Sequence, residues 1–182
     1  MSSRSVLLLL VVLLFLASPL PAHEEGFPEK TLKSVFPQAT GFTPRKKAFT
    51  AAQVKQIEEA SGSKIQRNDN PLNFYVALGK SPDGSGVLGT VVFVDAQGPN
   101  GSMDLALGVK RDGTIEKVVV TENADDPALS AAAFLDQLKG KNATSPLGLG
   151  KDIRFTGNPK AAEIFLSTVR RGLQMLVAAG SK

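Results

Sequence analysis

The residues best suited to chemistry lie in one short turn near the C-terminal end, at 155–160 ("FTGNPK"). Asn158 is a strong helix N-cap residue, and Pro159 suits the first helical position. The free N–H groups and the dipole of such a helix start attract anions, and Thr156 adds a hydroxyl. Positive charge is close by in the sequence, on Lys151, Arg154 and Lys160. The turn therefore predicts either a phosphate seat or only a capped helix start, and the residues by themselves favour the capped start.

The other candidates for catalysis are few. Asp125 and Asp126 are adjacent and precede Pro127, but an acid–base pair needs a partner at a controlled distance, and capping explains Asp126 without chemistry. The only histidine is His23. A terminal copper site would need a second histidine, and a nucleophilic triad would depend on this one residue. We predict no catalytic residues and no metal site.

Composition excludes further classes of function. The chain has no cysteine, which excludes disulfides, thiolate-bound iron–sulfur clusters and c-type haem attachment. Its 182 residues and 42% hydrophobic content suit one domain with a substantial core. The formal net charge of +4 comes from charges of alternating sign with no long basic block, so we predict no nucleic-acid binding.

Residues 1–22 have the pattern of a secretory signal peptide. Arg4 supplies the positive start, "VLLLLVVLLFL" is an apolar run, and "ASPLPA" provides small residues that end at Ala22. The apolar run is shorter than the roughly 20 residues that a membrane span needs. We predict an exported or periplasmic protein, cleaved near Ala22, that contacts a membrane only if the leader is retained.

The rest of the chain must supply the elements that position the turn. We expect a short helix that Pro37 ends, and a second helix over 49–62 with Thr50 as N-cap and Gly62 as terminator. Strands are expected at 73–80, 87–96, 103–111 and 114–123, and helices at 125–141 and from Pro159 onward. Segment 23–49 is expected to precede a domain over 50–182.

Two details of this pattern carry most of the fold prediction. Asp112-Gly113 stands between two alternating runs, which is a strong hairpin signal. The last helix has one apolar stripe, and Arg171 is among the polar residues expected to face away from it. Helices, then strands, then helices indicate an α+β fold with a mainly antiparallel, twisted sheet flanked by helices.

From about Leu32 to Val177 the chain resembles the periplasmic FMN-binding domain family. Members occur in the C subunit of the sodium-pumping NADH:quinone oxidoreductase, the Rnf complex G subunit and the nitrous-oxide reductase regulator. "VFPQAT", "FTAAQVKQIEEASG" and "VLGTVVFVDA" follow the family's layout, and "LGVKRDGTIEKVVVTEN" is similar to its hairpin "GVDPDGKIKGVEVLEH". "DDPAL" stands where the family has "ETPGLG", and "FTGNPKAAEIFLSTVRRGL" aligns with its "D-x-x-S-G-A-T-x-S" signature and following helix.

The resemblance implies an electron-carrying flavin domain, with departures at the attachment motif. Thr156 and Gly157 take the Ser-Gly places, and Asn158 replaces the alanine. Pro159 falls where the family carries the threonine esterified to the FMN phosphate, and proline has no hydroxyl, so covalent attachment at Pro159 is not possible. In the "ETPGLG" turn, Asp126 stands for threonine and Ala128 for glycine. Asp152 lies one residue upstream of the signature's aspartate.

Three outcomes follow from the resemblance. The domain binds FMN noncovalently, it has lost flavin and serves as an interaction or assembly module, or it binds another small ligand. In the first case the phosphate seat would be Thr156, Gly157, Asn158 and Lys160, and the ring would border Asp126, Pro127, Ala128 and Leu129. Phe155 is the nearest aromatic candidate to face a ring. The implied partner is a redox protein or a membrane electron-transfer complex.

Overall fold

The computed structural model describes residues 27–82 and 84–180. Its centre is a five-stranded sheet in which neighbouring strands are adjacent in sequence and antiparallel, in the order β1-β2-β3-β4-β5. The strands are β1 (Gly41–Lys47), β2 (Leu72–Leu78), β3 (Val87–Gln97), β4 (Ser102–Lys110) and β5 (Ile115–Asn123). The predicted α+β fold with an antiparallel sheet is confirmed. The predicted leader and His23 lie outside the described residues.

The β4–β5 hairpin forms where the sequence predicted it. Gly113 has a φ of +83°, a backbone conformation that glycine adopts without strain. The Asp112 carboxylate accepts hydrogen bonds from the Thr114 backbone N–H at 2.9 Å and from its hydroxyl at 2.6 Å. This short-range turn chemistry sets the register between β4 and the edge strand β5.

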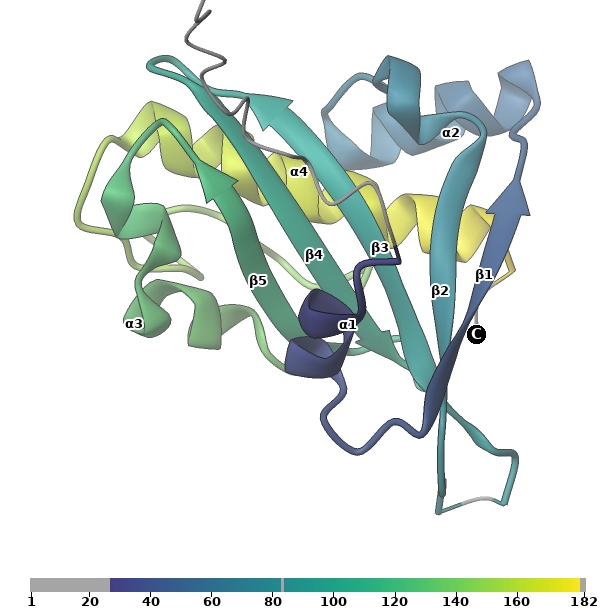
Figure 1. Cartoon of the computed structure of the whole chain (residues 1–182). Helices are drawn as coiled ribbons and strands as arrows, with labels where there is room; N and C mark the ends of the chain where they lie inside the picture. The colour runs from purple at the N-terminus through teal and green to yellow at the C-terminus, as the bar shows by residue number, and fades with distance from the viewer. Residues whose placement is uncertain (1–26, 83, 181–182) are drawn as a thin grey trace, which may run out of the picture.

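Helices cover both faces of the sheet (Figure 1). On one face, α4 (Pro159–Ala178) and α2 (Ala51–Ser61) pack over the larger core cluster, which includes Val92, Leu107 and Phe165. On the other face, α1 (Glu29–Val35) packs against a smaller cluster. The close approach of α1 requires Gly108 in β4, because a Cβ there would overlap the Val35 side chain. Residues 29–47 therefore provide one strand of the sheet, β1, and a helix, α1, that packs against the strands formed by later residues.

The cap predictions for α2 are confirmed. The Thr50 hydroxyl accepts a hydrogen bond from the Gln53 N–H, and the Gln53 side chain accepts one from the Thr50 N–H. Gly62 ends the helix in the left-handed conformation, with a φ of +69°. This reciprocal arrangement satisfies two backbone donors of the first turn.

None of the helices in the described part of the chain is long and apolar enough to cross a membrane.

Strand β1 was missed by the sequence analysis. Its sequence, "GFTPRKK", contains a proline and three basic residues and lacks the alternation typical of a strand. It lies at the edge of the sheet and pairs only with β2. An edge strand tolerates proline and lysine because one side of its backbone has no ladder partner. Pairing with β2, rather than local preference, makes this segment a strand.

The single helix predicted over 125–141 was also wrong. The segment contains three short pieces: the 3-10 helix η2 (Pro127–Ser130), α3 (Ala132–Leu135) and the 3-10 helix η3 (Asp136–Leu138). Ala131 is extended, with φ −70° and ψ 132°, and interrupts the helix. Leu129, Phe134 and Leu138 nevertheless all reach the core. Their burial explains why their spacing suggested one continuous helix.

Arg171 was wrongly predicted to face solvent. It lies on α4 with only 1% of its surface exposed. Its Nε lies 2.9 Å from the Asp69 carboxylate, at ion-pair distance but without the alignment of a hydrogen bond. Its other two nitrogens donate to the Ser63 hydroxyl at 2.8 Å and the Asp95 carbonyl at 2.6 Å. The apolar stripe of α4 is therefore interrupted by a charge that α4 alone could not have accommodated.

Candidate functional site

Two segments that the sequence analysis selected meet in space. Asp126 is the N-cap residue of η2, and Asn158, 32 positions later, is the N-cap residue of α4. One carboxylate oxygen of Asp126 accepts a hydrogen bond from the Asn158 backbone N–H at 2.6 Å, and the other accepts one from the Ala128 N–H at 2.9 Å. The segment after β5 thus lies beside the start of α4, at the β5 edge of the sheet (Figure 1).

These contacts define the electrostatics of the turn. The hydrogen bond from the Asn158 N–H, followed by that from Ala128, lowers the pKa of Asp126 below its usual value. Among the described residues, no lysine or arginine side chain forms an ion pair with this carboxylate. Two backbone amides therefore stabilise the ionised form of Asp126. At neutral pH the turn contains this negatively charged carboxylate.

The start of α4 is the capped helix that the sequence predicted. The Asn158 side-chain oxygen accepts a hydrogen bond from the Lys160 N–H at 3.1 Å, and Pro159 occupies the first turn. The Asn158 carbonyl accepts from the Ala162 N–H at 3.1 Å. The backbone N–H groups of Asn158 and Lys160 are thus both bonded to oxygens of the protein itself.

Gly157 allows the turn to close. A Cβ at this position would overlap the Asp126 carboxylate and would lie 2.6 Å from the Phe155 ring. Both neighbours are part of the turn's own contacts, so a larger residue would displace the Asp126 carboxylate or the aromatic ring. Gly157 is therefore needed for the close approach of Asp126 to the helix start.

A groove opens beside this turn. It has a volume of about 500 Å³ and is lined by Ala128, Ala131, Ala133, Phe134, Gln137, Arg154, Phe155 and Thr156. The rings of Phe134 and Phe155 meet edge to face with centroids 4.8 Å apart, and Phe134 continues to Phe165 in the core at 5.2 Å. A mainly apolar groove of this size, with few polar groups at its rim, is the ordinary form of a small-molecule site.

Gln137 holds one wall of the groove, and the sequence analysis did not select it. Its side-chain amide donates to the Arg154 carbonyl and to the Ala133 carbonyl, both at 2.9 Å. Its side-chain oxygen accepts from the Arg154 N–H at 2.8 Å. A glutamine in a helical segment has no local signature for such a role. Only the approach of residue 154 to η3 shows it.

The predicted site residues have different locations around the groove. Ala128 and Thr156 line it, and Gly157 and Asn158 lie next to it in the turn. Pro127 and Lys160 are exposed. Leu129 is fully buried and belongs to the core. The fold thus brings together the two predicted segments, but the Leu129 side chain belongs to the core and does not line the groove.

The flavin that the resemblance implies fits one part of this site and not the other. Its planar ring requires apolar and aromatic walls, and Phe134, Phe155 and Ala128 provide them. A phosphate requires free hydrogen-bond donors. The Asn158 N–H already donates to the Asp126 carboxylate, which is negatively charged like a phosphate. Pro159 offers no hydroxyl for an ester. The groove fits the ring, whereas the helix start disfavours the phosphate because a carboxylate of the protein already accepts the Asn158 N–H.

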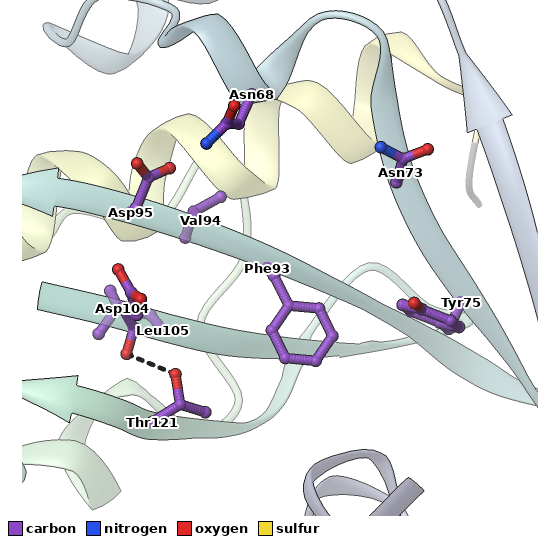
Figure 2. A pocket seen from close by; sticks show the side chains of 9 residues that line it. All are labelled: Asn68, Asn73, Tyr75, Phe93, Val94, Asp95, Asp104, Leu105 and Thr121. Atoms are coloured by element: carbon purple, nitrogen blue, oxygen red, sulfur yellow. Dashed lines mark hydrogen bonds between the residues drawn. The ribbon is translucent and has the colours of Figure 1, made fainter. Parts of the chain in front are cut away.

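A second cavity, of about 380 Å³, lies on the face of the sheet that carries α1 (Figure 2). The β2–β3 pairing ends at Phe74 and Val92, whereas β3 and β4 remain paired to Gln97. The cavity lies in the fork where β2 separates from β3. It is lined by Asn68, Asn73, Tyr75, Phe93, Val94, Asp95, Asp104, Leu105 and Thr121.

Two carboxylates stand opposite each other in this second cavity. Asp95 and Asp104 are directly opposite across β3 and β4, an arrangement that is unfavourable for like charges. The edge-to-face pair of Tyr75 and Phe93, with centroids 5.9 Å apart, forms its aromatic part. The fork contains no residue of the two segments that resemble the FMN-binding motifs, and we assign no function to it.

The Asp69–Arg171 pair is structural. Burial raises the pKa of Asp69, while the Arg171 charge and the Gln66 N–H, which donates to the carboxylate at 2.7 Å, act in the opposite direction. Asp69 is 2% exposed, so no solute reaches it. Among the described residues, no group of three or more His, Cys, Asp or Glu side chains is placed to hold a metal ion.

The chain shares its overall arrangement with a solved structure. No family model matches the chain, and no curated protein matches it. The structure is similar to the crystal structure of NqrC from Shewanella oneidensis, with 16% sequence identity, coverage of 84% of each chain and a TM-score of 0.48. A likeness of this degree carries no information about the function of the groove.

Proposed function

We propose that this chain is a noncovalent flavin-binding domain that carries electrons in an exported redox system. The observation that carries the proposal is an apolar groove of about 500 Å³ placed where the segments around Asp126 and Asn158 converge. The sequence resemblance to FMN-binding domains concerns the same two segments. When bound, a flavin supplies reversible one- and two-electron redox chemistry.

The residues of the groove would hold the ring and shield it from water on one side. Phe155 and Phe134 offer aromatic edges, and the alanines at 128, 131 and 133 leave room for a flat ligand. Gln137 fixes the wall that contains Phe155 and Thr156 through its bonds to the Arg154 backbone. The Thr156 side chain is exposed at the rim and supplies a hydroxyl for a polar group of the ligand.

An electron carrier also needs contact with its partners. Ala131, Ala133 and Thr156 are exposed, so one side of the groove faces solvent. A redox protein or a membrane electron-transfer complex could approach the bound ring from this side. The location outside the cytoplasm is inferred from the signal-like residues 1–22. Without a covalent tether, retention there would require a sub-micromolar Kd, which is a binding free energy of about 8 kcal/mol or more.

The proposal is tested by titrating the full chain with flavins and following the quenching of flavin fluorescence. Ala133→Leu adds bulk inside the groove and should weaken binding about tenfold or more. The matched control is Ala132→Leu, because Ala132 is also exposed and on α3 but lines a different depression beside Ser34 and Val35. Equal effects of the two substitutions would show that the ring does not bind in this groove.

A flavin-free interaction module is the second candidate. It is favoured by Pro159, which has no hydroxyl for the ester, and by Asp126, which occupies the amide that a phosphate would need. Both features are compatible with a domain that keeps the fold after losing its cofactor. If the chain binds neither FMN nor riboflavin at micromolar concentrations, the carrier proposal is rejected and the module remains.

A further inference from the structure

We infer that the groove selects a flavin without a phosphate, such as riboflavin, over FMN, and that Asp126 determines this preference. The inference rests on the proposed function and specifies its ligand more narrowly. It comes from one feature of the structure: the place where an anion would bind to this turn already holds a carboxylate of the protein.

The first step is the position of the carboxylate. Asp126 reaches from η2 to the backbone N–H of Asn158, at a distance of 2.6 Å, and also accepts from the Ala128 N–H at 2.9 Å. Amides at a helix start are the groups that bind phosphates in other proteins. Here one of them is used internally by Asp126, and the next, from Lys160, is used by the Asn158 side chain.

The second step is charge. The hydrogen bonds that Asp126 accepts favour its ionised form, so the carboxylate keeps its charge at neutral pH. A phosphate monoester carries a charge of about −1.5 to −2 under the same conditions. Placed at this helix start, it would either displace Asp126 from Asn158 or remain beside it as a like charge. Both arrangements weaken phosphate binding.

The third step is the lack of a compensating cation at the carboxylate. Lys160, Arg154 and Lys151 are exposed, and in the described part of the chain none of them forms an ion pair with Asp126. Solvent screens all of these charges, but the carboxylate of Asp126 is the one held directly against the Asn158 amide by a hydrogen bond. The charged group nearest to the Asn158 amide is therefore the carboxylate.

An uncharged polyol chain meets the opposite situation. Each carboxylate oxygen has a second lone pair beyond the one that accepts the backbone N–H, and the terminal 5′-hydroxyl of riboflavin, which is a phosphate ester in FMN, is a hydrogen-bond donor. A hydrogen bond from a neutral donor to an ionised carboxylate is among the stronger kinds. Asp126 thus disfavours the phosphate of FMN and favours the 5′-hydroxyl that riboflavin has in its place, while the other ribityl hydroxyls are common to both flavins.

The test is a pair of titrations on the full-length chain, one with riboflavin and one with FMN, read by flavin fluorescence. We expect riboflavin to bind about tenfold tighter or more, and Asp126→Asn and Asp126→Thr to reduce this ratio at least severalfold by strengthening FMN binding. Asp125→Asn is the matched control. Asp125 is the neighbouring carboxylate, but it accepts hydrogen bonds from Asn100 in the β3–β4 turn, so its removal should leave the ratio unchanged.

The outcomes separate the two proposals. FMN binding to the unmodified chain as tightly as riboflavin, or more tightly, overturns the inference and leaves the carrier proposal intact. A preference for riboflavin that persists unchanged in both folded Asp126 variants also overturns it. Failure of both flavins to bind overturns the inference together with the proposed function. The comparison on the unmodified chain needs no variant, so a variant that fails to fold does not prevent the test.

Discussion

The guanidinium of Arg171 lies 2.9 Å from the carboxylate of Asp69, and both side chains are 1% exposed. This pair joins α4 to the 3-10 helix η1 (Arg67–Asp69), and the further bonds of Arg171 reach Ser63 and the backbone of β3. The removal of one partner would leave the other as an unpaired buried charge, which is costly.

Arg171→Met should therefore destabilise the fold by about 3–5 kcal/mol, as measured by urea denaturation. The variant should also lose stability as pH rises above the usual pKa of an aspartate, about 3.9. Without Arg171 the folded-state pKa of Asp69 rises further, and a raised carboxyl pKa means that ionisation at higher pH opposes folding. Lys55→Met is the control. It removes an exposed pair with Glu59 and should cost at most about 0.5 kcal/mol.

Asp126 should give a pH dependence of the opposite sign. Its folded-state pKa is lowered, so its contribution is present above the unfolded pKa and is lost as pH falls through the folded value. Asp126→Asn should thus reduce the melting temperature at pH 7. The difference from the parent should shrink below about pH 4. A difference that is constant across this range would contradict the assignment of the charge to Asp126.

Asn158→Ala should cost about 1 kcal/mol of stability, because the Lys160 N–H loses its side-chain acceptor. Chemical denaturation measures this change. Thr50→Ala removes the corresponding cap of α2 and should have an effect of similar size. No measurable loss for Asn158→Ala would mean that α4 does not depend on this cap.

Gln137→Ala should loosen the groove wall without disrupting the core. The Arg154 N–H loses its acceptor, so hydrogen exchange at residues 153–156 should accelerate, and riboflavin affinity should fall about severalfold. Gln174→Ala is a matched control, since Gln174 donates to a loop carbonyl, that of Ala143, remote from the groove lining. Equal exchange rates at 153–156 in Gln137→Ala and the parent would refute the positioning role.

Asp95→Asn should stabilise the protein by about 0.2–1 kcal/mol, because Asp95 stands directly opposite Asp104 and also lies close enough to raise the pKa of Asp69. Added salt should reduce this gain by screening the exposed part of the repulsion. Thermal unfolding at low and high salt is the measurement. The gain should be absent in Glu163→Gln, which removes an exposed carboxylate on α4. Destabilisation by Asp95→Asn would show that the carboxylate has a favourable role in the fork.

Features with local causes were predicted from the sequence. Signals within a few positions of one another predicted the Asp112-Gly113 turn, the caps of α2 and α4, and the alternating runs of β4 and β5. The β-branched residues of β3 predicted that strand in the same local way. The same local patterns selected Asp126 and the turn from Thr156 to Lys160 as the segments of interest. Each of these signals is contained in a short window of sequence.

The predictions that failed depend on contacts between distant residues. Strand β1 forms because its backbone pairs with β2. The helix predicted over 125–141 is interrupted by the extended Ala131. Arg171 can be buried because Asp69 and the Asp95 carbonyl, which lie on other elements, pair with its guanidinium.

The amino-acid sequence by itself thus determined the antiparallel α+β fold and the two segments that form the candidate site. Only the tertiary structure decided what the site can bind, since it joined Asp126 to Asn158 and Gln137 to Arg154. The physical reason is range: turn geometry and capping act between near neighbours in the chain. The charge at a binding site depends on which side chain folding brings to it.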